Sequence, residues 1–212
     1  MDTGEDTPRK PARLLLHACC GPCLIEPLDA LASEADHVTI VFANPNIHPA
    51  EEYVRRRDTL QAYAADAGVD VVELPYAPET WIDAVSPLAN AGAARCRACY
   101  RLRLGAVARY AAAEGFDAIA TTLTVSPYQD AEAIRVEGEA AAAGVGIVYV
   151  HRDFRERYAD ATRRSRELGM YRQNYCGCAI SEAEAATDRA ARKAARVAEK
   201  AVRAAARERS SD

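Results

Sequence analysis

Residues 13–23, RLLLHACCGPC, predict a buried strand that runs directly into a tight turn and then into a helix. The apolar run Leu14–Leu16 suits a short strand that is covered on both faces. Pro22 suits the first turn of a helix, which we expect to continue to about Glu34. The segment therefore predicts the start of an α/β unit. Three cysteines occupy its turn: Cys19, Cys20 and Cys23.

The rest of the chain repeats this alternation of short apolar runs and amphipathic segments. We expect further strands at residues 37–42, 69–74, 117–123 and 146–150, and helices at 50–67, 79–90, 99–114 and 128–143. This order predicts a mostly parallel, doubly wound five-stranded sheet with helices on both faces. Ligands bind beyond the carboxyl ends of the strands in such sheets. The cysteine turn, the loop with Asn44 and the turn at Ser126 all follow strands, which predicts one site built by several loops.

The length of 212 residues favours one full domain rather than two. Residues 1–12 are polar and contain two prolines, so we expect a disordered lead-in before an α/β domain at residues 13–181. Residues 182–212 are rich in alanine and arginine, and helix is expected over 181–208. We interpret this segment as a long, solvated C-terminal helix with a frayed end, in preference to a docking arm for an acidic partner.

The net charge of −4 argues against non-specific binding to nucleic acid, which needs an excess of lysine and arginine. Arginines cluster at residues 55–57, 95–103 and 163–166, and we interpret each cluster as a solvated helix face. No apolar run approaches the ~20 residues of a membrane span, and none suits a signal peptide. We therefore expect a cytoplasmic protein without a membrane partner, whose thiols are kept reduced.

Seven cysteines fall into three groups, at residues 19–23, 96–99 and 176–178. An odd number of thiols in a reducing compartment fits a disulfide framework poorly. Thiols three residues apart at the start of a helix can bind a tetrahedral zinc or a [4Fe–4S] cluster. Seven thiols exceed what one structural zinc needs, which favours redox or cluster chemistry. The adjacent Cys19 and Cys20 would need strain to reach one centre, so one of them is expected to have a second role. We expect the neighbouring His17 to be a core histidine rather than a ligand.

At these motifs the sequence resembles the cobalamin-independent epoxyqueuosine reductase family, the QueH type. The resemblance covers roughly residues 13–181, in the family's order and spacing. The matching segments are 15–24 (LLHACCGPCL), 42–46 (FANPN), 96–104 (CRACYRLRL), 121–128 (TTLTVSPY) and 172–181 (RQNYCGCAIS). The resemblance implies a Rossmann-like, adenine-nucleotide-hydrolase-like fold and a [4Fe–4S] cluster with an additional iron beside it, which zinc can replace in preparations. It also implies reduction of epoxyqueuosine in tRNA to queuosine, the last step of queuosine biosynthesis.

The resemblance also implies the residues of the site. The metal ligands would be Cys19, Cys20, Cys23, Cys96 and Cys99, with Cys176 and Cys178 close by. The pair Cys176 and Cys178 could store an electron or bind the additional iron, and we favour the role of ligand, above all for Cys176. Tyr175 is the candidate proton donor, and electrons would come from an external donor. Candidate contacts to the substrate, a tRNA anticodon loop carrying epoxyqueuosine, are Arg97, Arg101, Arg103, Asn44, Asn46, Ser126 and Tyr128.

Three other functions are compatible with parts of this pattern. A tRNA-modifying enzyme of the ATP-pyrophosphatase kind shares the implied fold, but its phosphate loop S-G-G-x-D-S is replaced here by CCGPC. A non-catalytic zinc-binding module for RNA or protein would contain zinc and no sulfide. A metal-free thiol oxidoreductase would be insensitive to chelators and to anaerobic handling.

Overall fold

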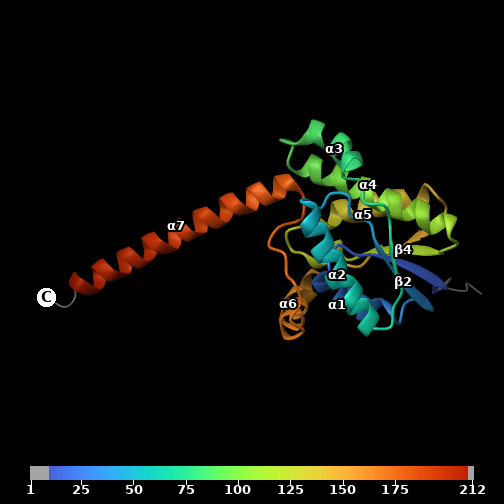
Figure 1. Ribbon diagram of the computed structural model, residues 1–212, viewed down its shortest axis with the longest axis horizontal. Coiled ribbons are helices and arrows are strands. Elements are labelled where there is room, and N and C mark those ends of the chain that lie inside the picture. The colour runs from blue at the N-terminus through green and yellow to red at the C-terminus, as the bar shows by residue number, and fades with distance from the viewer. Residues whose placement is uncertain (1–9, 210–212) are drawn as a thin grey trace, which may run out of the picture. The chain divides into compact units, whose positions relative to one another are not determined.

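A computed structural model describes residues 10–209 of the chain, with side chains described up to Lys200. The chain divides into two compact units, Met1–Arg172 and Gln173–Asp212, and each is described by itself. The first unit is an α/β structure with a five-stranded, fully parallel sheet, as the sequence predicts (Figure 1). The expected disorder of residues 1–12 falls almost entirely on residues 1–9, which lie outside the described residues.

The sheet has the strand order β3-β2-β1-β4-β5. Its strands are β1 (Arg13–His17), β2 (His37–Phe42), β3 (Val71–Glu73), β4 (Ala118–Thr121) and β5 (Val148–Tyr149). The strand β1 is central, and its last residue, His17, pairs with Val41 of β2 and with Thr121 of β4. The order of the strands reverses between β1 and β4, and this is the point at which doubly wound sheets bind ligands. The turn that follows β1 therefore lies at the expected functional position.

Alternate side chains of β1 enter two separate cores, one on each face of the sheet. Leu14 and Leu16 pack with α1 (Gly21–Leu31), α2 (Ala50–Asp66) and α6 (Tyr158–Glu167). Leu15 packs on the opposite face with α4 (Ala93–Ala113) and α5 (Ala131–Ala143). Figure 1 shows these two helical layers with the sheet between them. All three leucines are fully buried, and each burial stabilises the fold by about 1.5–3 kcal/mol.

Shorter elements complete the first unit. They are α3 (Pro78–Val85) and the 3-10 helices η1 (Ser86–Leu88), η2 (Leu123–Val125) and η3 (Arg155–Arg157). For the helix α6 no bounds were predicted from the sequence, although the arginines at 163–166 were interpreted as a helix face. The predicted strand at 69–74 is confirmed only as the short β3, and the one at 146–150 only as β5.

Two predicted helix starts are wrong. The helix expected from Cys99 begins at Ala93, because residues 93–98 contain no helix breaker and the break falls at Gly92, which has a positive φ of 48°. The cysteines of this segment therefore lie inside α4 and not before its N-terminus. The helix expected from residue 128 begins at Ala131, because the carboxylate of Asp130 accepts a hydrogen bond from Ala133 N at 2.9 Å and caps it. The Ser126–Pro127 pair lies in the preceding turn.

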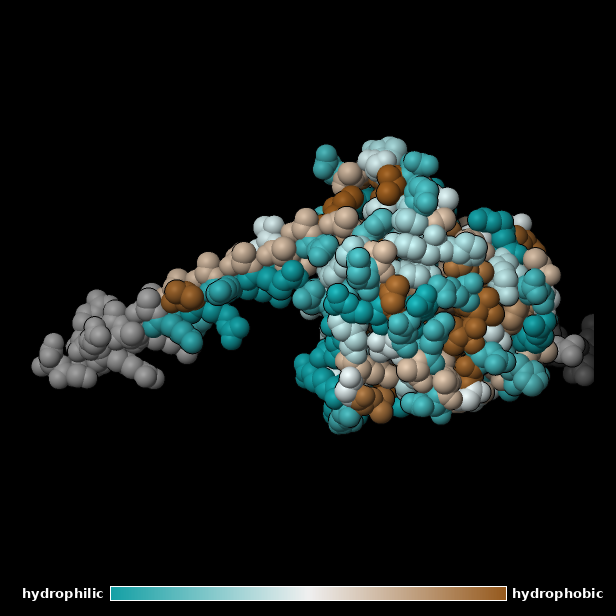
Figure 2. Space-filling model, in the orientation of Figure 1, coloured by the Kyte–Doolittle hydropathy of each residue, from teal (hydrophilic) through white to brown (hydrophobic). Residues whose placement is uncertain are grey.

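The second unit consists of a short irregular segment and the helix α7 (Ala179–Arg209), which confirms the predicted long C-terminal helix. Figure 2 shows hydrophilic side chains along one edge of α7 and mostly alanine-like, weakly hydrophobic ones along the other. No helix in the described part of the chain is long and apolar enough to cross a membrane.

Candidate metal centre

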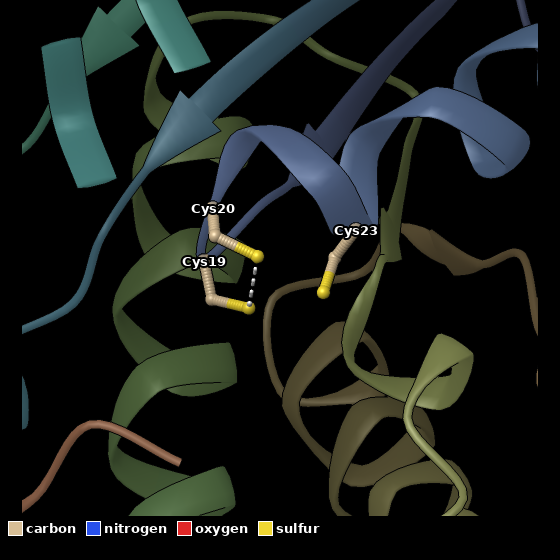
Figure 3. Close-up of side chains that lie close together, drawn as sticks. All are labelled: Cys19, Cys20 and Cys23. Atoms are coloured by element: carbon tan, nitrogen blue, oxygen red, sulfur yellow. Dashed lines mark hydrogen bonds between the residues drawn. The ribbon is translucent and has the colours of Figure 1, made fainter. Parts of the chain in front are cut away.

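The turn after β1 brings three thiols together. The Sγ atoms of Cys19, Cys20 and Cys23 all lie within 4.8 Å of one another, and those of Cys19 and Cys20 are 3.9 Å apart. Figure 3 shows the three side chains converging from the loop and from the first turn of α1. We expected Cys19 and Cys20 to reach one centre only under strain; both sulfurs belong to this group, and the chain bends at both residues before α1 begins. One turn thus supplies three potential metal ligands.

Gly21 allows this turn to lie against α2. A Cβ atom at this position would lie 2.9 Å from Cγ2 and 3.2 Å from the carbonyl oxygen of Thr59. The second contact is with backbone, which cannot rotate away as a side chain can. Only glycine therefore fits between the thiols and α2 without displacing one of them.

Two buried arginines lie near the thiols. Arg56 of α2 and Arg103 of α4 are each 1% exposed. The Nε of Arg56 donates to Glu52 at 2.6 Å, and Nη2 of Arg103 donates to Oδ1 of Asn44 at 2.5 Å. The interpretation of the arginine clusters as solvated faces is therefore wrong for Arg56 and Arg103, and also for Arg95, which is 7% exposed.

These surroundings separate the pKa values of the three thiols. The pKa of Cys19 lies well below its ordinary value because the thiols of Cys20 and Cys23 donate hydrogen bonds to its sulfur, and Arg103 and Arg56 add positive charge. Burial raises the pKa of Cys20. The hydrogen bond that the Cys20 thiol donates to Cys19 raises it further, because this bond retains the proton on Cys20. The pKa of Cys23 is raised because its hydrogen bonds to Cys19 and Cys20 retain its proton. Cys19 is therefore the thiol that ionises first and the one prepared to bind a metal.

His17 is fully buried beneath the thiols, as a core histidine rather than a member of their group. Its Nδ1 lies 2.8 Å from Oγ1 of Thr121, and its Nε2 lies 3.3 Å from the carbonyl oxygen of Ala43 and 3.4 Å from Nη2 of Arg103. Burial and the charge of Arg103 lower the pKa of His17 to about 3, so the ring is neutral at neutral pH. The neutral ring joins β1, β2 and β4 at the carboxyl ends of these strands.

Two asparagines follow β2, and both are buried. Asn44 donates through Nδ2 to the carbonyl oxygen of Ala18 at 2.9 Å, so it fixes the residue that precedes the thiols. Asn46 is 1% exposed, and its Oδ1 has no hydrogen-bond partner within the described residues. A buried acceptor without a partner costs about 1–3 kcal/mol, which marks Asn46 as a candidate ligand contact.

The helix α4 carries the second pair of cysteines on one face, one turn apart. Cys96 and Cys19 both pack against the apolar cluster of Tyr100, Leu104, Leu123 and Ile134, and Cys99 is 8% exposed. The compact group of sulfurs found within the described residues contains the three thiols of the β1 turn and not those of α4. The structure thus places Cys96 beside the same apolar cluster as Cys19.

Other candidate substrate contacts lie on α4 and after β4. Arg97 and Arg101, with side chains 49% and 67% exposed, both donate to Glu137 of α5, at 2.5 and 2.8 Å. Ser126 Oγ accepts from the backbone of Tyr128 at 3.3 Å. Tyr128 is 79% exposed and contacts Tyr158 edge-on, with ring centroids 6.4 Å apart. Arg103 differs from these residues because its guanidinium faces Asn44 and His17 in the interior.

The third group of cysteines belongs to the second unit. Cys176 and Cys178 precede α7, and Gly177 between them has a φ of 131°, which favours glycine. Ser181 N donates to Sγ of Cys178 at 3.3 Å, and Ser181 Oγ donates to its carbonyl oxygen at 2.8 Å. The first turn of α7 therefore fixes Cys178. Tyr175 precedes this segment in the same unit.

The sequence contained an unused signal for the buried arginines. Arg56 lies three residues after Tyr53 and four before Leu60, and all three are buried on one face of α2. Arg103 lies in the same way between Tyr100 and Val107 on the buried face of α4. An arginine is a candidate for burial when its helical spacing places it on the same face as apolar residues. Counting the arginines in a cluster does not reveal this spacing.

Comparisons with known proteins match this chain over most of its length. A family model described as epoxyqueuosine reductase QueH matches residues 14–184. A protein of this name from Dehalococcoides mccartyi is 35% identical over 173 residues, which cover 81% of this chain and 93% of that protein. One from Staphylococcus aureus is 32% identical over 188 residues (83% and 78%), and one from Thermotoga maritima is 32% identical over 175 residues (79% and 89%).

Substitution of Gly21 by alanine should destabilise the protein by about 1–3 kcal/mol, because the new Cβ must displace either the thiol turn or the backbone of α2. Gly105→Ala is the matched control, since its Cβ would meet only the end of the Arg109 side chain within α4. Urea unfolding of the two metal-free variants measures the difference. Equal stability of the two would contradict the proposed packing constraint.

Substitution of Arg103 by methionine should raise the pKa of Cys19, because it removes a positive charge that favours the thiolate. A rise of one unit would slow alkylation of Cys19 about tenfold at a pH below its pKa. Peptide mapping of metal-free protein after iodoacetamide pulses at several pH values measures this effect. Arg101→Met is the control, because Arg101 is exposed and paired with Glu137. An unchanged pH profile in Arg103→Met would refute this electrostatic role.

Proposed function

This chain belongs to the epoxyqueuosine reductase QueH family, and we propose that it reduces epoxyqueuosine in the anticodon loop of tRNA to queuosine at a [4Fe–4S] cluster. Membership in this family makes the protein an oxidoreductase. The observation that carries the proposal is the group of three sulfurs after β1, at the point where the strand order reverses. A metal can be held there by thiolates alone.

The residues present fit a cluster with thiolate ligands. Three sulfurs lie within 4.8 Å of one another, one of them has a lowered pKa, and two buried arginines offset the negative charge of bound thiolates. We assign the ligands of the cluster and of the additional iron together to Cys19, Cys20, Cys23, Cys96, Cys99 and Cys176, four of which suffice for the cluster itself. Zinc can occupy such cysteine sites in preparations that have lost iron.

The reaction breaks both C–O bonds of the epoxide, forms a C=C bond and releases the oxygen as water, and it consumes two electrons and two protons. When bound, the cluster supplies electrons one at a time and the additional iron supplies a Lewis acid for the oxygen. We propose that the phenol of Tyr175 donates one of the two protons. The thiols of Cys176 and Cys178 would act as ligands of this iron when it is bound, or would store the second electron. An external donor restores the electrons, and we place the reaction in the cytoplasm, where thiols remain reduced.

The proposed substrate contacts combine charge, stacking and one buried acceptor. Arg97 and Arg101 are exposed and positioned by Glu137, which suits contacts to phosphates. Tyr128 is exposed next to Ser126, and its ring offers a stacking surface for an unstacked base. Asn44 and Arg103 are buried and do not contact the substrate in this proposal. They hold the thiol turn in place through hydrogen bonds. The Oδ1 atom of Asn46 accepts a hydrogen bond from the modified nucleoside in this proposal.

Protein purified without oxygen should contain about four irons and four sulfides per chain, or one iron more, and should reduce epoxyqueuosine in tRNA. Metal analysis, sulfide assay and the visible spectrum test the cluster, and nucleoside analysis of the tRNA tests the reaction. One zinc without sulfide, even after anaerobic reconstitution, would support a structural zinc module instead. Activity that persists after chelation and in air would support a metal-free thiol oxidoreductase.

Substitution of Tyr175 by phenylalanine should lower the rate of reduction about a hundredfold or more, because it removes the proposed acid and leaves the ring. Iron and sulfide content should stay unchanged, which separates the loss of a proton donor from the loss of the cluster. Tyr110→Phe, on α4, is the matched control and should react like the unaltered protein. A full rate in Tyr175→Phe would exclude Tyr175 as the proton donor.

A further inference from the structure

The helix α7 carries a continuous basic stripe. Five side chains line one shallow hollow on its surface together with Val197: Arg189, Arg192, Lys193, Arg196 and Lys200. Their spacings of three and four residues place them on one face of the helix. In the sequence, Arg203 and Arg207 continue the same spacing. None of the ion pairs found among the described residues involves any of these five side chains.

The stripe concentrates positive charge in a chain that is acidic as a whole. Residues 189–209 contain eight lysines or arginines and only two glutamates, whereas the net charge of the whole chain is −4. The stripe from residue 189 to 200 extends roughly 16 Å along the helix axis, at 1.5 Å per residue. A nucleic-acid strand presents a negative charge every few ångströms over such a length. The stripe therefore matches an extended polyanion better than a single anion.

We propose that the basic stripe of α7 binds the sugar–phosphate backbone of tRNA, outside the nucleotide that reacts. This inference rests on the proposed function, because that function makes a tRNA the polyanion that the protein must hold. The stripe lies beyond residues 14–184, to which the family match is confined. The proposed interaction therefore lies outside the part of the chain that the family model matches.

The other face of α7 does not favour a lipid surface as the occupant. Interfacial helices bury bulky side chains such as tryptophan, phenylalanine and leucine. In the sequence of α7 the aliphatic residues larger than alanine are only Ile180, Val197 and Val202. Figure 2 shows the weakly hydrophobic edge that results from the many alanines. A helix with this edge and a dense basic stripe is better suited to bind phosphate groups that are exposed to water than to insert into a lipid surface.

The test compares tRNA binding by three full-length variants with that of the unaltered protein. In the first, Arg192, Lys193 and Arg196 are changed to glutamine, which has a similar helix propensity. In the second, the same change is made at Lys10, Arg135 and Arg163, exposed residues of the first unit that are already ion-paired. The third, R192K with R196K, retains the charge of the stripe. Circular dichroism checks that helix content is equal in all of them.

Fluorescence anisotropy with labelled tRNA at several salt concentrations gives the readout. The first variant should bind about tenfold more weakly, with a salt slope reduced by about two, because each lost phosphate contact lowers the slope by about 0.7–0.9. The second and third should bind like the unaltered protein. Unchanged binding by the first variant, or equal weakening of the first and second, would overturn the proposal.

Two further measurements exclude other occupants of the stripe. Binding to vesicles containing phosphatidylserine, or self-association in sedimentation, that is lost in the first variant while tRNA binding is unchanged would also overturn the proposal. Turnover of epoxyqueuosine tRNA is measured in parallel with the unaltered protein. Absence of turnover in that protein contradicts the proposed function alone, whereas the comparison of tRNA affinities decides the role of the stripe.

Discussion

The site depends on how positive charge is buried beneath three thiols. A guanidinium in the interior costs several kcal/mol unless hydrogen bonds and opposite charge compensate for the lost hydration. Arg56 is compensated by Glu52, whereas the partners of Arg103 described above, Asn44 and His17, are neutral. Hydrogen bonds from Cys20 and Cys23 lower the pKa of Cys19, and the positive charges of Arg103 and Arg56 lower it further. Buried positive charge thus favours the thiolate of Cys19, which is a potential metal ligand.

The neutral state of His17 is part of the same arrangement. A protonated ring would place a second positive charge 3.4 Å from the guanidinium of Arg103, and burial would add to this cost. The neutral ring instead contacts Thr121 and Ala43, and so holds the ends of β2 and β4 against β1. Asn44 then connects Arg103 to the carbonyl group of Ala18. Protein groups thus help to hold the thiol turn in place.

The architecture could be predicted from the sequence because the spacing of apolar residues and the positions of glycine and proline determine helices and strands locally. Leu14–Leu16, Pro22 and the spacing of later strands sufficed for a parallel sheet with the cysteine turn at its carboxyl edge. The sequence did not predict the start of α4 or the burial of Arg56 and Arg103, because both depend on which helical face meets the sheet. The bends of the backbone at Cys19 and Cys20, which bring the adjacent thiols into one group, could not be deduced from the sequence. The roles of Cys176, Cys178 and Tyr175 stay predictions.

An enzyme that acts on RNA with thiolate ligands has an electrostatic difficulty of its own. Ionised thiols repel a polyanion, and the arginines that compensate them, Arg56 and Arg103, are buried and cannot reach phosphates. Part of the charge of the exposed Arg97 and Arg101 is offset by Glu137. Phosphate contacts determine position and affinity, whereas contacts to the base determine which nucleotide is recognised. These two tasks need not share a surface. In our proposal the basic helix supplies affinity, while the site around the thiols keeps the charge balance that a bound metal would require.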